Sequence, residues 1–574
     1  MRQRLDVDPR SAAMNTPELP AYADLLIKMR PSQFAGRVRR AVPPRIMAAG
    51  LRLEPPPGWS PVASGLGLDD APQSGPTPPP HLDATFRFVG RERAFCNGRP
   101  FWEPGDDGLL FAFHVHEFRE LARFAAESPN GPGWDFWSEV LRSWLEHCSA
   151  VDVPAWHPYP LSGRLLAWCA ALSAAPSELP GTLTARMRES AWLQTRYLRR
   201  CVERDIGGNH VLRNAVALAV AATCFESGPL RTYADTLLQR ELRRQILPDG
   251  GHEERSPAYH RAILSDLRAL ETVDDRATGR PRAWLTQVIR SMEEWQAALV
   301  GPDGALPLLN DAWEGPALQR RKEDPITVLP STGYVVLRHG GDQAVLDVAP
   351  LAPAHLPAHA HADALSFVLW ADGEPIVVDP GTFTYAGRER NAFRGTAAHN
   401  TVTVDDEDQC RFWGPFRASF LPRVQLVDIR RTEGVVLVRA RHDGYRRLAD
   451  PVVHERLFAW LPGDGLVVVD SLECERPHAA TTRLHFAPAR TGPLRVEPLG
   501  DGVAIAEQTG RVSPFLGTSV PAAVLEQTLH AEPGRAFGWS LLRPGASARL
   551  ERDALRLNLR DGRVVEVPLP RGDR

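Results

Sequence analysis

Residues 331–348 read STGYVVLRHGGDQAVLDV, and within them the spacing of apolar residues changes from a helical period to a period of two. Segments of the same kind recur downstream at 375–379, 400–405, 434–444 and 555–569, and the last carries Asp561-Gly562 as a hairpin turn. Many short strands without intervening helices predict an all-β domain of sandwich type that runs to the C-terminus.

Upstream of residue 331 the apolar residues recur at helical spacing. The pattern predicts eight consecutive helices, over residues 110–126, 136–148, 161–174, 183–202, 211–225, 233–247, 258–273 and 284–299. Short loops between them favour hairpins arranged in a ring or bundle. Tyr22–Val42 reads as one basic amphipathic helix, and the Pro-, Gly- and Ser-rich stretch 54–82 reads as a surface linker or strap. The expected division is an N-terminal extension (1–95), a helical domain (96–325) and a β domain (326–574).

Composition narrows the possible partners. The 574 residues carry 67 Lys+Arg against 70 Asp+Glu, a formal net charge of -3, so no global cationic field is present to hold nucleic acid or an anionic membrane. The seven cysteines form no C-x-x-C pair, which argues against a disulfide framework and a cysteine metal site. No segment approaches eighteen uninterrupted apolar residues and the N-terminus shows no apolar signal core, so we expect no membrane span and a cytoplasmic chain.

The stretch HAHADALSFVLW (359–370) carries the densest metal-binding chemistry. If it is a strand, His359, His361 and Asp363 project to one face. Asp379 then ends the next strand and His399 opens a third, so that His361, Asp379 and His399 form a two-histidine, one-carboxylate set suited to zinc. The alternative is that these are hydrogen-bonded histidines at strand ends.

Two polar clusters in the helical half have ordinary structural explanations. In DIGGNHVLRN (205–214), Asn209 or His210 starts a helix, and a plain N-cap is the simpler interpretation. In PLLNDAW (307–313), Asn310 and Asp311 fit a turn.

Tyr259 lies in the first turn of a predicted helix, after Ser256 as N-cap and Pro257. A tyrosine there is usually a packing residue. The positive end of the helix nevertheless favours the phenolate, so we expect the pKa of Tyr259 to be lowered from about 10.

Several motifs resemble, in order, the heparinase II/III-like family, which includes heparinase III and the oligoalginate lyases. They are GGNHVLRNAVAL (207–218), ILPDGGHEERSPAYH (246–260), LPLLNDAW (306–313) and HAHADALSFVLWADGEPIVVDPGTFTY (359–385). The resemblance implies an α+β multidomain chain: an incomplete (α/α) toroid followed by an antiparallel β-sandwich domain. It also implies cleavage of an acidic, uronate-containing polysaccharide by β-elimination.

The resemblance assigns roles by position. Asn209 and His210 match the pair facing the uronate carboxylate, Tyr259 the catalytic tyrosine and His359 the catalytic histidine. His361, Asp379 and His399 match the ligands of a structural zinc. Substrate-binding positions are expected at Glu254, Arg255 and Tyr385.

Two other functions compete with the lyase. In a metal-dependent glycan hydrolase, the three metal ligands would hold a reactive water. A non-catalytic exopolysaccharide-binding or assembly factor would retain the fold alone, although such a protein has no need of a proton-transfer set.

Overall fold

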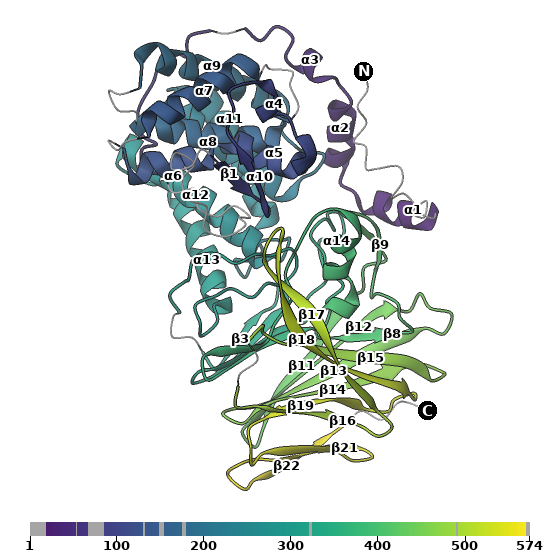
Figure 1. Cartoon of the computed structure of the whole chain (residues 1–574). Coiled ribbons are helices and arrows are strands. Elements are labelled where there is room, and N and C mark those ends of the chain that lie inside the picture. Colours follow the sequence, from purple (N-terminus) through teal and green to yellow (C-terminus); the bar gives the residue numbers. More distant parts are fainter. Residues whose placement is uncertain are drawn as a thin grey trace.

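The computed structural model describes residues 19–52, 54–66, 85–129, 133–148, 154–174, 179–320, 324–489 and 492–569. A helical N-terminal part is followed by a C-terminal part of antiparallel sheets. The two meet near α12 (Pro257–Thr278), α13 (Ala283–Leu299) and α14 (Gly387–Arg394), as Figure 1 shows. Most of the predicted strap, residues 67–82, lies outside the described residues. No helix in the described part is long and apolar enough to cross a membrane.

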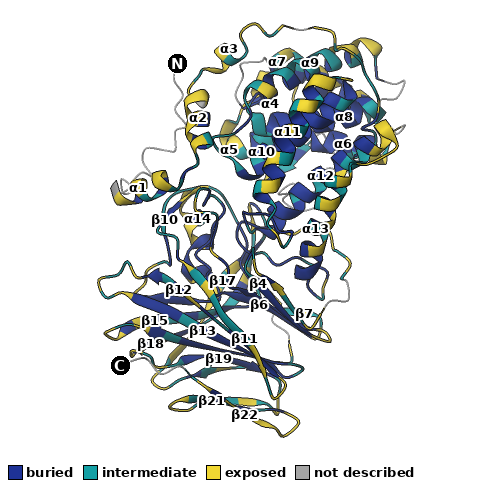
Figure 2. Cartoon of the chain, turned by 180° about the vertical axis from the view of Figure 1, so that it is seen from behind, coloured by how far each residue is buried: buried dark blue, intermediate teal, exposed yellow. Residues whose placement is uncertain are grey.

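The helical part closely follows the predicted apolar pattern. Its helices are α4 (Arg99–Trp102), α5 (Gly108–Glu117), α6 (Arg119–Glu127), α7 (Trp134–His147), α8 (Pro158–Ala174), α9 (Gly181–Arg200), α10 (Gly208–Cys224), α11 (Gly228–Gln245), α12 (Pro257–Thr278) and α13 (Ala283–Leu299). Helices α8 and α10 are buried on nearly all sides, and Figure 2 shows them as the dark interior of this part. The first residue of α10, Gly208, lies close to the Leu356 side chain of the C-terminal part.

Two predicted helices are each broken in two. The helix predicted over 110–126 divides into α5 and α6 at Phe118, which takes a left-handed φ of 58° while its ring packs on Trp102 and Trp144. The segment 22–42 forms α1 (Leu19–Lys28) and α2 (Pro31–Arg40), because the residue before a proline avoids helical geometry. A short hairpin of β1 (Thr85–Phe88) and β2 (Arg91–Ala94) precedes α4.

The β part is built of antiparallel sheets that share apolar cores. The sheet next to the helices has the order β3-β4-β5-β6-β7, and the largest has the order β11-β12-β13-β14-β19-β16. One core joins these two sheets, and a second joins the largest sheet to the outermost sheet, β20-β21-β22. The fourth sheet, β17-β18-β15-β8, flanks them, and β9 pairs with β10.

The strands have the following bounds: β3 (Ile326–Leu329), β4 (Tyr334–His339), β5 (Asp342–Asp347), β6 (Phe367–Ala371), β7 (Glu374–Val377), β8 (Val402–Val404), β9 (Arg411–Gly414), β10 (Arg417–Ser419), β11 (Val424–Thr432), β12 (Val435–Tyr445), β13 (Val452–Leu461), β14 (Gly465–Glu473), β15 (His478–His485), β16 (Arg495–Leu499), β17 (Ala504–Phe515), β18 (Thr518–Ala531), β19 (Phe537–Leu542), β20 (Ser547–Leu550), β21 (Ala554–Asn558) and β22 (Val564–Pro568). The hairpin predicted around Asp561-Gly562 is present as β21 and β22.

The segment 359–366 is not the strand that its alternation predicts, since β6 begins only at Phe367. Two of its backbone donors bond to side chains: His361 N–H donates to Asn310 Oδ1, and Ala364 N–H donates to Gln409 Oε1. A third, Leu365 N–H, donates to the Asp347 carbonyl of β5, outside any regular ladder. Leu365 takes a left-handed φ of 63°. The chain here is an irregular loop held by polar side chains.

Candidate active site and metal centre

Three aromatic side chains that are far apart in the sequence meet where the helices contact the sheets. The ring centroids of Tyr259, in α12, and His359, in the loop before β6, are 4.1 Å apart. The hydroxyl of Tyr385, in the loop after β7, lies 2.9 Å from that of Tyr259. Groups from the two halves of the chain can therefore touch the same small ligand.

The start of α12 sets the position of Tyr259. Ser256 Oγ accepts the Tyr259 N–H at 3.2 Å as a true N-cap and donates its own proton to the Asp311 carbonyl at 2.5 Å. Trp313 packs edge-on against the Tyr259 ring at 5.1 Å. The N-cap serine thus ties the tyrosine to the loop that also holds His359.

The expectation of a lowered pKa for Tyr259 is wrong. Burial raises the pKa of its phenol well above the ordinary value, and the neighbouring Tyr385 and Tyr159 add to this shift. The phenol is only 9% exposed, so the cost of desolvating a phenolate outweighs the favourable helix end. At neutral pH Tyr259 carries its proton.

Asp311 connects the aromatic group to His361, one of the predicted metal ligands. Its carboxylate lies 2.8 Å from His359 Nδ1 and 3.0 Å from His361 Nε2, and it forms a two-pronged ion pair with Arg390. Burial opposes its charge, but Arg390 and the hydrogen bonds from the two histidines hold the pKa of Asp311 well below its usual range. The turn interpretation of this loop missed that role, because these partners are distant in sequence.

An ionised carboxylate can only accept hydrogen bonds, so both histidines donate to Asp311. His359 then donates through Nδ1, and its Nε2, which carries the lone pair in the neutral imidazole, lies 3.6 Å from Glu254 Oε2. His361 is protonated at Nε2 and keeps a lone pair on Nδ1, for which no hydrogen-bond partner is found among the described residues. One carboxylate therefore fixes both tautomers.

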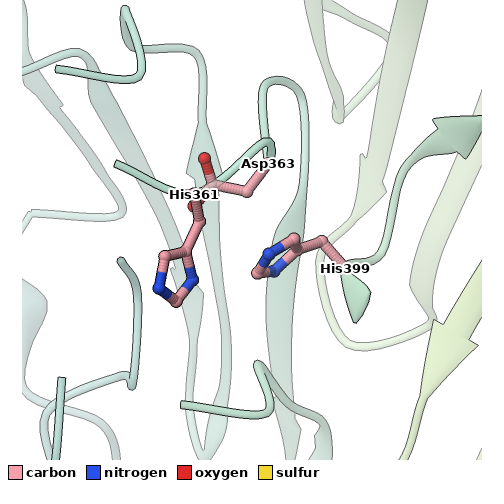
Figure 3. A group of neighbouring side chains, drawn as sticks. All are labelled: His361, Asp363 and His399. Atoms are coloured by element: carbon pink, nitrogen blue, oxygen red, sulfur yellow. The ribbon is translucent and has the colours of Figure 1, made fainter. Parts of the chain in front are cut away.

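Ligand atoms of His361, Asp363 and His399 lie within 4.8 Å of one another (Figure 3). All three side chains are buried, and His361 Nδ1, His399 Nε2 and both Asp363 oxygens lack hydrogen-bond partners among the described residues. Asp379 occupies a different place from the one predicted: its Oδ2 accepts the His399 Nδ1 proton at 2.8 Å. The convergent carboxylate is that of Asp363, and Asp379 orients a histidine from behind.

The chemistry of this donor set fits a divalent cation. Burial lowers the pKa of His361 to about 4, which leaves its imidazole neutral, the form that binds metals. Burial raises the pKa of Asp363 to about 6. Burial and the neighbouring Asp363 carboxylate together raise the pKa of Asp347 well above its usual range. Buried, unpartnered lone pairs and clustered carboxylates are what a zinc ion would satisfy, with two histidines and one carboxylate as its ligands.

Asn209 is not an N-cap, because α10 begins at Gly208 with Gly207 before it. The Asn209 side-chain amide donates to both oxygens of the Glu254 carboxylate, at 2.8 and 3.1 Å. Glu254 can approach this closely because residue 208 is a glycine: a Cβ there would lie 2.0 Å from Glu254 Oε1. Glu254 therefore links the start of α10 to His359.

Two other predicted site residues, His210 and Arg255, have protein partners in this structure. His210 Nδ1 lies 3.1 Å from the Glu203 carboxylate, and its ring packs on Tyr159 at 4.8 Å. The Arg255 guanidinium donates to the Thr332 and Glu253 carbonyls, both at 3.2 Å. These bonds join the segment before α12 to the turn before β4, and the substrate-binding role of Arg255 stays a prediction.

A cavity of about 10 Å³, the size of one water molecule, adjoins Tyr259. It is lined by Asn209 and by three residues that the sequence analysis missed, Tyr159, Arg213 and Trp313. The spacing of Arg213 from Asn209 is a usable signal, since residues four apart share one face of a helix. The Arg213 contacts are long: 3.5 Å to the Tyr159 hydroxyl, with Asp266 and Glu117 oxygens at 3.9 and 3.7 Å.

Comparison with known proteins identifies the family. The profile described as "Heparinase II/III N-terminus" matches residues 123–332, and that described as "Heparinase II/III-like, C-terminal" matches residues 321–554. The crystal structure of heparinase III superposes with a TM-score of 0.68 at 15% identity, over 98% of this chain and 99% of that one. A heparan sulfate lyase HepC mutant from Pedobacter heparinus superposes with a TM-score of 0.61 at 17% identity, over 94% of each chain.

Two relatives extend the comparison at the sequence level. FtsZ-localized protein C of Caulobacter vibrioides is 26% identical over 432 residues, which cover 71% of this chain and 72% of that protein. A heparin-sulfate lyase of Bacteroides stercoris is 26% identical over 255 residues, so the match spans only 36% of this chain and 38% of the lyase. Because the two profiles follow each other from residue 123 to residue 554, the chain belongs to the heparinase II/III-like family.

Proposed function

We propose that the protein is a polysaccharide lyase that cleaves an acidic, uronate-containing polysaccharide or oligosaccharide by β-elimination. The observation that carries this proposal is the contact between Tyr259 and His359 at the junction of the two parts. A protonated phenol next to a histidine with a free Nε2 lone pair is an acid and a base within reach of one sugar ring. The names of the heparin-sulfate lyase relatives agree with this chemistry.

In the proposed reaction His359 Nε2 takes the proton from C5 of the uronate, and the C5–H electron pair becomes the C4=C5 double bond. The C4–O4 bond breaks, and Tyr259 gives its proton to the departing O4. Asp311, at 2.8 Å from His359 Nδ1, stabilises the imidazolium that forms. The raised pKa of Tyr259 favours this division of roles over one in which the tyrosine is the base.

Removal of the C5 proton places extra negative charge on the uronate carboxylate, which must be stabilised. Arg213 is suited to this, because its guanidinium lines the cavity beside Tyr259 and its present contacts are long. A fork of N–H donors matches a carboxylate, and one well-placed donor contributes about 3 kcal/mol to such a transition state. Asn209, in the same wall, is the second donor once its amide turns from the Glu254 carboxylate, to which it donates in this structure.

The proposal includes a structural zinc ion held by His361, Asp363 and His399. Zinc would supply no acid or base here: it would fix the loop 359–366 and so the ring of His359. We also infer the finer fold, an incomplete (α/α) toroid packed on a β-sandwich, from the order of the helices and from the core shared by the two larger sheets.

The lyase is tested with a panel of uronate polysaccharides, namely heparan sulfate, alginate and hyaluronan. Elimination creates a conjugated double bond, so a cleaved substrate gains near-ultraviolet absorbance and a hydrolysed one does not. Tyr259→Phe should abolish the gain while the melting midpoint stays unchanged. The control Tyr197→Phe alters a buried tyrosine of α9 outside the site and should remain active. An active Tyr259→Phe variant contradicts the assigned role.

One observation favours a second candidate, a non-catalytic factor. The relative with 71% coverage of this chain is named for its localization with FtsZ and not for cleavage. Such a factor would form no unsaturated product from any member of the panel. Chain shortening without near-ultraviolet absorbance would instead favour the metal-dependent hydrolase.

A further inference from the structure

A second cavity, of about 680 Å³, lies at the opposite end of the sheets from Tyr259. It opens where the edge strands of the two larger sheets approach each other: Ile326 belongs to β3, and Arg431 belongs to β11. Strand β4 gives the separation. Its first residue, Tyr334, donates to the Arg255 carbonyl near α12, and its last residue, His339, lines the cavity about 17 Å away.

The described wall of this cavity is positively charged. Its positive charge comes from Arg320, Arg338 and Arg431, which line it together with His339, and no acidic side chain lines it among the described residues. Arg320 donates to neutral acceptors, the Gly340 carbonyl at 3.3 Å and Gln343 Oε1 at 3.4 Å. For the Arg431 guanidinium, the described part of the chain offers no ion pair.

Other arginines near this end of the sheets are matched with acids. Arg560 pairs with Asp464, and Arg543 pairs with Asp342 at 2.7 Å. Even Arg430, the neighbour of Arg431 on β11, pairs with Asp428 at 3.1 Å. The positive charge of the cavity therefore stands out against a neighbourhood in which cations have carboxylate partners, and it favours an anionic ligand.

The remaining wall is apolar. Ile326, Val436 and Trp460 contribute to it together with two prolines, Pro325 and Pro462. A volume of this size lies in the range of small-molecule sites, and guanidinium forks beside apolar walls suit a ligand with carboxylates or sulfates on rings that have apolar faces. Acidic sugars have that combination. Nucleic acid fits less well, because the formal net charge of the chain is -3.

We propose that this cavity is a second, non-catalytic binding site for an acidic oligosaccharide. Only the sugar class rests on the proposed lyase function; the cavity and its charge do not. The site holds a segment of glycan chain away from the reacting centre, with Arg320 and Arg431 contacting its acidic groups.

The test is calorimetric titration of the full chain carrying Tyr259→Phe, so that no ligand is consumed. The probes are hexasaccharides of heparan sulfate, alginate and hyaluronan, with neutral maltohexaose as the control ligand. Arg431→Glu is compared with Arg430→Glu, because successive strand residues point to opposite faces and the charge change is the same. Arg320→Gln, at an independent position, guards against a local folding defect at β11.

We expect one binding event to weaken at least tenfold in Arg431→Glu and several-fold in Arg320→Gln, and Arg430→Glu to bind as the parent does. If the lyase proposal fails, the parent shows a single event instead of two, yet Arg431→Glu still removes it. Equal binding by Arg431→Glu and Arg430→Glu overturns the second site. Equally strong binding of inorganic sulfate alone, or tighter binding of a hexanucleotide, overturns the assignment to a glycan.

Discussion

Replacement of Asp311 by asparagine should damage both stability and metal binding, because one carboxylate serves four buried partners, His359, His361, Thr382 and Arg390. An asparagine keeps the shape but has one acceptor oxygen and an NH₂ group that donates. It cannot accept protons from His359 and His361 and also pair with Arg390. At least one histidine must then change its tautomer or lose its bond.

The size of the effect follows from burial. Arg390 is 1% exposed, and its ion pair with Asp311 joins two side chains that water does not reach. Removing one partner of a buried pair typically costs about 3–5 kcal/mol, since the remaining charge stays desolvated. For the sheet-rich part this corresponds to a fall in melting midpoint on the order of 10 °C.

The assay compares melting midpoints and bound-metal content of the parent, Asp311→Asn, and the double variant Asp311→Asn/Arg390→Gln. The double variant should recover part of the loss, because it no longer buries an unpaired cation. The matched control, Asp428→Asn, removes partly exposed pairs with Arg430 and Arg439 and should cost less than about 1 kcal/mol. If Asp311→Asn is as mild as this control, the reasoning from burial is refuted.

Three further predictions test neighbouring parts of the site. Asp363→Asn should abolish metal retention in elemental analysis, whereas Asp379→Asn should weaken metal affinity by about 10–100-fold; equal losses would contradict the assigned positions. Arg213→Lys keeps the charge but loses the fork, so kcat/KM on a cleaved substrate should fall by about 100-fold, and an unchanged value would remove the residue from the mechanism. Burial raises the pKa of Asp266 to about 7, so its contribution to stability is full below pH 4 and is lost as pH rises through 7. In melting curves at different pH, the stability of Asp266→Asn should therefore decline with pH by up to about 4 kcal/mol less than that of the parent. An equally steep decline in both proteins would exclude Asp266 as its source.

Local pattern predicted the fold well because most helices here bury one continuous apolar stripe. The eight helical patterns correspond to nine helices, and the extra boundary is at Phe118. Neither glycine nor proline marks that break. It follows from the packing of the Phe118 ring among Trp102, Trp144 and Trp168, which no short window of sequence contains.

The sequence predicted those residues of the candidate site that belong to motifs. It missed those whose role depends on contacts with residues distant in the sequence. Tyr259, His359 and Tyr385 were named from the sequence and lie together in the structure. Asp311 was read as a turn, because its partners His359 and Arg390 follow it by 48 and 79 residues. The same distance explains why the pKa of Tyr259 was expected to fall: a helix end is visible locally, whereas the walls that bury a phenol are not.

In the structure Asp363, and not Asp379, completes the group of ligand atoms with His361 and His399. This arrangement shows what the alternating pattern HAHAD (359–363) encodes. Alternation correctly placed His361 and Asp363 toward a common point, although the segment is a loop and not a strand. In a loop, that geometry must be held by other groups: Asn310 fixes the His361 backbone, Asp311 fixes its ring, and a bound cation would join both side chains to His399. Because Asp311 also holds His359, loss of the cation should disturb the proposed base through this shared carboxylate without removing any reacting group.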